Sequence, residues 1–134
     1  MAASEREINP AATPSGTGCL ECDTTGSWWL HLRRCAACGH VGCCDDSLNR
    51  HASAHAQDTA HPVIQSFEPG EDWFWNYALK AFAHGPRLAD PQHHPTDQTV
   101  PGPASRVPAA HAARGCKSNK ARVPSRSAVA ARSR

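Results

Sequence analysis

Aromatic residues are scarce in this 134-residue sequence and are confined to one part of it. The four tryptophans, three phenylalanines and one tyrosine all lie between Trp28 and Phe82. Residues 85–134 contain none and are rich in proline, alanine, serine and arginine without periodicity. Such a segment cannot bury enough apolar surface to offset the entropy lost on ordering. We therefore expect a flexible leader at 1–17, one domain at 18–84 and a disordered basic tail at 85–134.

Long apolar runs are also missing. The first residues, MAASEREINPAA, contain no apolar segment of the kind found in signal peptides. We therefore expect a cytoplasmic protein without membrane association, whose thiols stay reduced. This expectation argues against a disulfide framework for the seven cysteines.

Basic residues are few outside the tail. Residues 1–84 carry five Lys/Arg and ten Asp/Glu, whereas residues 85–134 carry nine and two. The expected domain is therefore acidic and shows no basic stripe for nucleic acid. Weak, salt-dependent attraction of nucleic acid or another polyanion to the tail is the alternative function.

Cysteine and histidine, in contrast, are concentrated between residues 19 and 61. Six of the seven cysteines lie there, in CLEC and CAACGHVGCC, and HASAHAQDTAH follows. Each C-x2-C pair has the spacing that lets two thiolates bind one tetrahedral ion. Iron–sulfur ligation would leave the histidines unexplained, so zinc is the predicted metal. The candidate ligands are Cys19, Cys22, Cys35, Cys38, either Cys43 or Cys44, His51, His55 and His61.

Eight ligands are enough to fill two closed zinc sites. A closed site is structural, because a catalytic zinc keeps one position open for water or substrate. No separate nucleophile and base stand out in the sequence, so we expect a protein that is not an enzyme. A zinc or thiol enzyme using Cys44 is the least favoured interpretation, and Cys116 has no assigned role.

Local patterns predict a small α+β domain with an antiparallel sheet of about three or more strands and one main helix. Predicted strands cover residues 28–34, 63–67 and 73–79, and on the third the odd-numbered side chains from Trp73 to Leu79 share one face. The predicted helix is capped by Asp46 or Ser47 and continues to about residue 58.

The motifs CLEC, CAACGHVGC and H-x3-H-x5-H, leading into PVIQSFEP, resemble the UBP-type zinc finger over residues 18–80. This family includes modules that bind the C-terminus of ubiquitin. The GCCDDS and PGEDWFWNY segments are more similar to its short bacterial members than to its eukaryotic ones.

The resemblance implies two interleaved zinc ions in place of two consecutive fingers. The first site would use Cys19, Cys22, Cys43 and His51, and the second would use Cys35, Cys38, His55 and His61. Cys43 stands five residues after Cys38, as in the family, but the family's gap of seven residues to the histidine fits Cys44. A third zinc is not expected, because Asn76 and Leu79 replace the family's extra cysteines.

For function, the resemblance implies a pocket for a free Gly-Gly carboxylate. Trp75 and Tyr77 match the family's Trp-x-Tyr and are the predicted ligand-binding residues. The family's pocket arginine is absent, because Asp45 follows the cysteine pair, and Arg33 replaces a tryptophan. We therefore predict a non-catalytic module that binds a peptide or protein, with altered or lost ubiquitin-tail specificity. A C-terminal tail is one form that this partner could take.

Overall fold

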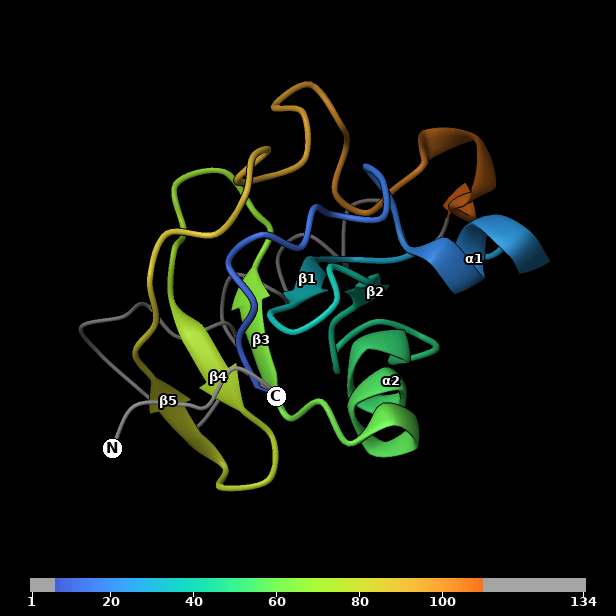
Figure 1. Ribbon diagram of the computed structural model, residues 1–134. Coiled ribbons are helices and arrows are strands. Elements are labelled where there is room, and N and C mark those ends of the chain that lie inside the picture. The colour runs from blue at the N-terminus through green and yellow to red at the C-terminus, as the bar shows by residue number, and fades with distance from the viewer. Residues whose placement is uncertain (1–6, 110–134) are drawn as a thin grey trace.

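The computed structural model describes residues 7–109, which form one five-stranded antiparallel sheet with two α-helices beside it (Figure 1). The strands are β1 (Leu32–Cys35), β2 (Val41–Cys43), β3 (Val63–Ser66), β4 (Phe74–Asn76) and β5 (Ala81–Ala83), arranged in the order β2-β1-β3-β4-β5. The helices are α1 (Leu20–Thr25) and α2 (His51–Thr59), and a 3-10 turn covers Ala104–Arg106. The predicted α+β class is confirmed. Neither described α-helix is long and apolar enough to cross a bilayer.

The second C-x2-C pair spans the end of β1 and the turn that joins it to β2. The Gly39 amide donates to the Cys35 carbonyl at 2.9 Å, which reverses the chain between the two strands. Gly39 has a φ of 85°, and a Cβ there would lie only 1.9 Å from the Thr13 carbonyl oxygen. Only glycine suits this position, because the backbone is left-handed and the leader approaches closely.

The two faces of the sheet are covered by different segments. Gly42 faces α2, since a Cβ at Gly42 would lie 2.8 Å from the Ala52 nitrogen. The side chain of Arg34 points to the other face, because Gly42 pairs with Arg33 and successive side chains alternate. There, its guanidinium donates to the carbonyls of Ala12, Ala89 and Pro91, each at 3.0 Å.

These contacts correct the expected domain boundaries. Ile8 from the leader and Leu88 from the tail are buried together against Val63 and Phe74. Further along, Gly102 forms a β-bridge with Trp29. We call residues 85–109 the strap, because they run back across the sheet to α1 (Figure 1). The predictions of a flexible leader and a disordered tail are therefore wrong for residues 7–17 and 85–109. The remainder, residues 1–6 and 110–134, lies outside the described part of the chain.

Two elements begin later than predicted, for identifiable reasons. The helix starts at His51 after Arg50, whose φ of 51° is left-handed. Ser47 does not cap it, because its hydroxyl accepts the Leu30 amide at 2.9 Å. The first strand starts at Leu32, because the preceding Trp29 pairs with the strap.

The predicted third strand is divided by a turn. The Asn76 side chain accepts the amides of Ala78 and Leu79 at 2.9 and 3.0 Å, a local bond pattern that competes with an extended strand. The chain then returns as β5, which pairs with β4. Trp73, Trp75 and Tyr77 do share one face, but Leu79 is 74% exposed and does not join them.

A buried carboxylate attaches the strap to the sheet. Glu68 Oε1 lies 2.9 Å from His94 Nε2 and 3.2 Å from His31 Nδ1, while Oε2 accepts the Leu32 amide. Burial opposes ionisation of Glu68, but the two histidines hold its pKa well below the usual range. Burial also lowers the pKa of His94, but the bond and the charge of Glu68 outweigh it and raise this pKa overall. The pair is therefore most favourable with Glu68 ionised and His94 protonated.

We predict that His94→Gln removes a pH-dependent part of the stability. The His94 contribution is complete below its unfolded pKa of 6.5 and is lost as pH rises through the higher folded value. The free energy of unfolding lost in the variant should be on the order of 1–3 kcal/mol at pH 6 and smaller at pH 9. Chemical denaturation at both pH values measures it. His93→Gln is the control, because the His93 ring contacts the His94 carbonyl and not a carboxylate. A His94→Gln loss that does not change with pH would contradict the prediction.

Candidate metal centres

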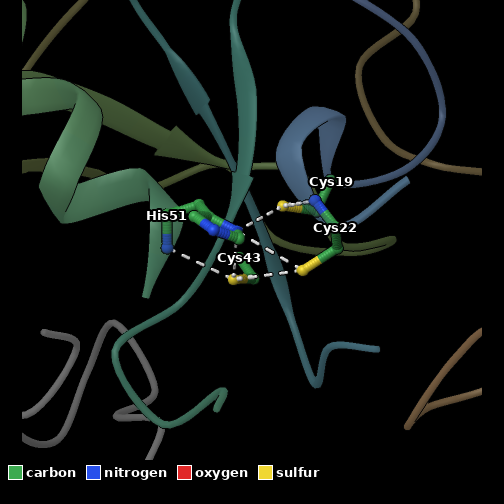
Figure 2. A group of neighbouring side chains, drawn as sticks. All are labelled: Cys19, Cys22, Cys43 and His51. Atoms are coloured by element: carbon green, nitrogen blue, oxygen red, sulfur yellow. Dashed lines mark hydrogen bonds between the residues drawn. The ribbon is translucent and has the colours of Figure 1, made fainter. Parts of the chain in front are cut away.

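The first cluster joins three elements at one point. Cys19 and Cys22 lie at the start of α1, Cys43 ends β2 and His51 begins α2 (Figure 2). Their four ligand atoms lie within 4.8 Å of one another. His51 Nδ1 is 3.2, 3.4 and 3.6 Å from the sulfurs of Cys19, Cys22 and Cys43.

The second cluster joins the end of β1 and the β1–β2 turn to α2 and the chain that follows it. It contains Cys35, Cys38, His55 and His61, whose ligand atoms also lie within 4.8 Å of one another. Cys35 Sγ is 3.6 Å from His61 Nδ1, and Cys38 Sγ is 3.3 Å from His55 Nε2. Cys38 is exposed, so this cluster is more accessible than the first.

The spacing of both clusters fits a tetrahedral metal ion. Zinc–sulfur bonds of about 2.3 Å and zinc–nitrogen bonds of about 2.0 Å place tetrahedral ligand atoms roughly 3.5–3.8 Å apart. The sulfur–nitrogen separations given above, and the 4.0 Å between Cys22 and Cys43, are close to these values. Each cluster could therefore hold one metal ion, and Cys/His donor sets of this kind suit zinc.

The electrostatics of the first cluster favour a bound cation. Hydrogen bonds from Cys19 and Cys43, with a smaller contribution from Asn49, hold the pKa of the Cys22 thiol far below its usual range. The bond to Cys22 raises the pKa of Cys19, and the bonds to Cys19 and Cys22 raise that of Cys43, with burial adding to both. Three thiols this close cannot all ionise without a positive charge between them. A bound divalent ion would supply that charge.

The second cluster has one histidine already in its metal-binding form. Burial, together with the neighbouring His40 and His61, lowers the pKa of His55 to about 4. His55 is therefore neutral at pH 7 and has a free nitrogen lone pair. The His40 ring stacks on His55 at 4.0 Å between centroids, and its Nε2 lies 2.7 Å from a Glu21 carboxylate oxygen. This contact connects α1, which carries the first pair, to the second cluster.

Amide groups around the first cluster are placed to stabilise thiolates. The Cys22 amide lies 3.4 Å from Cys19 Sγ, and the His51 amide lies 3.3 Å from Cys43 Sγ. The Asn49 side chain donates to Cys22 Sγ at 3.7 Å and to Ser27 at 2.7 Å. Such outer contacts orient metal ligands and tune their basicity. Sequence reasoning missed Asn49, and no spacing rule would have identified it.

Between the two adjacent cysteines, the structure places Cys43 in the cluster. Cys44 is buried outside it, with its sulfur 3.5 Å from the Ser47 hydroxyl. The two side chains diverge because consecutive residues leaving a strand point in opposite directions. His31 is not in either cluster, since it faces Glu68.

The predicted ligand-binding aromatics are less available than expected. Trp75 is only 2% exposed and packs edge-on against Phe82, with ring centroids 5.2 Å apart. Tyr77 belongs to the same aromatic cluster, and burial, then the charge of Asp45, raise the pKa of its phenol. Arg33 is 1% exposed and lies over the Trp73 ring at 4.7 Å. Arg34 is also buried, whereas Arg50 is exposed beside the first cluster.

Fold and clusters together define a small domain of the zinc-finger class. The family model described as "Zn-finger in ubiquitin-hydrolases and other protein" matches residues 19–88. The chain therefore belongs to this family, which the sequence motifs had indicated.

Two individual proteins are also similar. The solution NMR structure of protein RPA1320 from Rhodopseudomonas palustris is 40% identical with a TM-score of 0.57, covering 75% of this chain and 95% of that one. The NAD-dependent deacetylase sir2A of Dictyostelium discoideum is 32% identical over 74 residues. That match covers 55% of this chain but only 13% of the deacetylase, so the chain corresponds to a small part of that enzyme.

We predict that Cys43→Ser and Cys44→Ser have different effects on metal content. Cys43→Ser removes a thiolate from the first cluster and should lower bound zinc from two equivalents to about one. Cys44→Ser should leave two, because Cys44 lies outside both clusters. Native mass spectrometry of the purified variants provides the count. The assignment would be wrong if Cys44→Ser lost an equivalent and Cys43→Ser did not.

Proposed function

We propose that this chain is a non-catalytic zinc module that binds a peptide or protein partner, with altered or lost specificity for the ubiquitin tail. The observation that carries the proposal is the composition of the clusters. Each has four protein donor atoms within tetrahedral reach, so a bound zinc would have no open position for water or substrate. The proposed role of zinc is therefore to hold the fold, and the proposed activity is binding.

The surroundings of Tyr77 argue against a free carboxylate as ligand. Arg33 is held between Trp73 and the Leu32 carbonyl, to which it donates at 3.1 Å. Asp45 is close enough to raise the pKa of Tyr77 by its negative charge. An incoming carboxylate would meet that charge in a site of low polarity, where like-charge contact is costly. This supports a change of specificity relative to the family's ubiquitin-binding members.

A second place on the domain is better suited to a partner. A cavity of about 330 Å³ opens beside β5, and Trp73, Phe74 and Phe82 form much of its wall. Asp72 and His84 are its polar members, and acidic side chains outnumber basic ones in residues 1–84. We propose that it receives an apolar side chain of a peptide whose neighbouring residues are basic. The relationship to sir2A supports a module of this size within larger proteins, but that protein's deacetylase activity is not part of the proposal.

We predict that zinc-loaded full-length protein selects peptides from a random display library, and that Phe82→Ala weakens binding of those peptides at least about tenfold. The change removes an aromatic wall of the cavity, and anchoring side chains of this kind contribute about 1–2 kcal/mol or more. Fluorescence titration measures the affinity. Leu79→Ala is the matched control, because Leu79 is 74% exposed and is not among the residues that line the cavity.

Two further probes separate the alternatives. A ubiquitin C-terminal peptide and its C-terminal amide should bind equally weakly, and micromolar binding lost on amidation would contradict the change of specificity. Binding that persists in Phe82→Ala and falls steeply with salt would contradict the cavity and favour polyanion attraction.

A further inference from the structure

The end of the strap contacts the first metal cluster through one side chain. Arg106, on the 3-10 turn, donates to the carbonyls of Cys22 and Ser27 at 3.1 and 2.8 Å. Its second terminal nitrogen forms an ion pair with Asp23 at 2.8 Å. The guanidinium also lies over the Trp29 ring, 5.6 Å from its centroid. Four groups around α1 are therefore held by one residue that is 84 positions away from Cys22 in sequence.

The position of the Cys22 carbonyl affects the geometry of the cluster. α1 has only six residues and is followed by the capping residue Gly26, so it cannot be stable as an isolated helix. Its shape depends on capping bonds, and the Cys22 carbonyl also accepts the Ser27 amide at 2.9 Å. The carbonyl and the ligand sulfur both belong to Cys22, so fixing the carbonyl restricts where the sulfur lies. Planar guanidinium groups suit such a task, since they present several donors in a fixed geometry.

The strap is itself anchored before it reaches α1. Gly102 exchanges two backbone hydrogen bonds with Trp29, at 2.8 and 2.9 Å. Arg106 is thus presented by an ordered backbone and does not reach the cluster as a free surface side chain. It lies beyond residue 88, where the family match ends. The contact therefore lies outside the region that the family model matches.

We propose that Arg106 is a positioning residue for the first metal site, where it holds the first Cys pair in its ligating geometry and slows loss of the ion. The proposal rests on metal binding by the first cluster. Its action is mainly local, because Arg106 contacts none of the ligand residues of the second cluster. α1 reaches that cluster only indirectly, through Glu21 and the His40 ring that stacks on His55. The two clusters also differ in donor set, three sulfurs and one nitrogen against two of each, which makes them distinguishable by spectroscopy.

The test is loss of metal from each site of the full-length chain loaded with cadmium-113. In NMR spectra the Cys3His and Cys2His2 sites should give separate resonances, and the decay of each is followed after addition of EDTA. In Arg106→Ala, the Cys3His resonance should decay about tenfold faster than in the wild type, the size expected for an outer contact to a ligand. The Cys2His2 resonance should decay at the wild-type rate, which serves as the reference within the same molecule.

Three variants sharpen the result. Arg106→Lys retains the charge but has one nitrogen in place of two, so it cannot hold the two carbonyls and Asp23 together and should also accelerate loss. Asp23→Asn removes the ion pair and leaves the carbonyl bonds, so its effect should be smaller. Arg87→Ala breaks an exposed ion pair with Asp90 elsewhere in the strap and should change neither rate.

The proposal is overturned by equal acceleration at both sites, which would indicate a general effect on stability, or by no acceleration in Arg106→Ala. A wild-type rate in Arg106→Lys would overturn the requirement for the two-nitrogen guanidinium geometry. The absence of any Cys3His resonance in the wild type would contradict metal binding by the first cluster, and the proposal with it.

Discussion

The repulsion between buried thiolates is the constraint on which the rest of this structure depends. Cys19, Cys22 and Cys43 come from two different elements and have 0% exposure. Without a cation they can share only a limited negative charge, so two of the thiols have raised pKa values. A bound divalent ion would attract all three thiolates and so remove this conflict. Since the candidate ligands come from α1, β2 and α2, binding would also bring together elements that have little apolar surface of their own.

The rest of the domain is arranged around this point. α2 packs on the β2 edge through Gly42, while the leader and the strap cover the opposite face of the sheet. Arg34 is central to that second layer, because its buried guanidinium satisfies three backbone carbonyls from the two covering segments. The folded unit is therefore larger than its Cys/His motif. Its outer layer is held by charged and polar side chains, whereas a larger protein would bury apolar residues there.

The sequence predicted the clusters well and their surroundings poorly, for a physical reason. Metal ligands follow short spacings, so the C-x2-C pairs and the His51–His55 pair were visible without the fold. Contacts between residues distant in sequence were not predicted. Examples are the contacts of Ser47 with Leu30, of His94 with Glu68 and of Arg106 with Cys22. The strap has no aromatic residues, and we predicted a disordered tail there because an argument from composition considers only the apolar surface that a segment can bury. It is held instead by hydrogen bonds, one buried leucine and ion pairs, which leave no periodic pattern.

The central claim is that the two clusters bind metal and that the bound ions hold the fold together. The most direct test is native mass spectrometry of the purified full-length chain, combined with circular dichroism, before and after removal of metal by a chelator. The account predicts two zinc ions per chain and loss of the folded signal when they are removed, with recovery on adding zinc back. A chain that binds one ion or none, or that keeps its full secondary structure after both are removed, would contradict it.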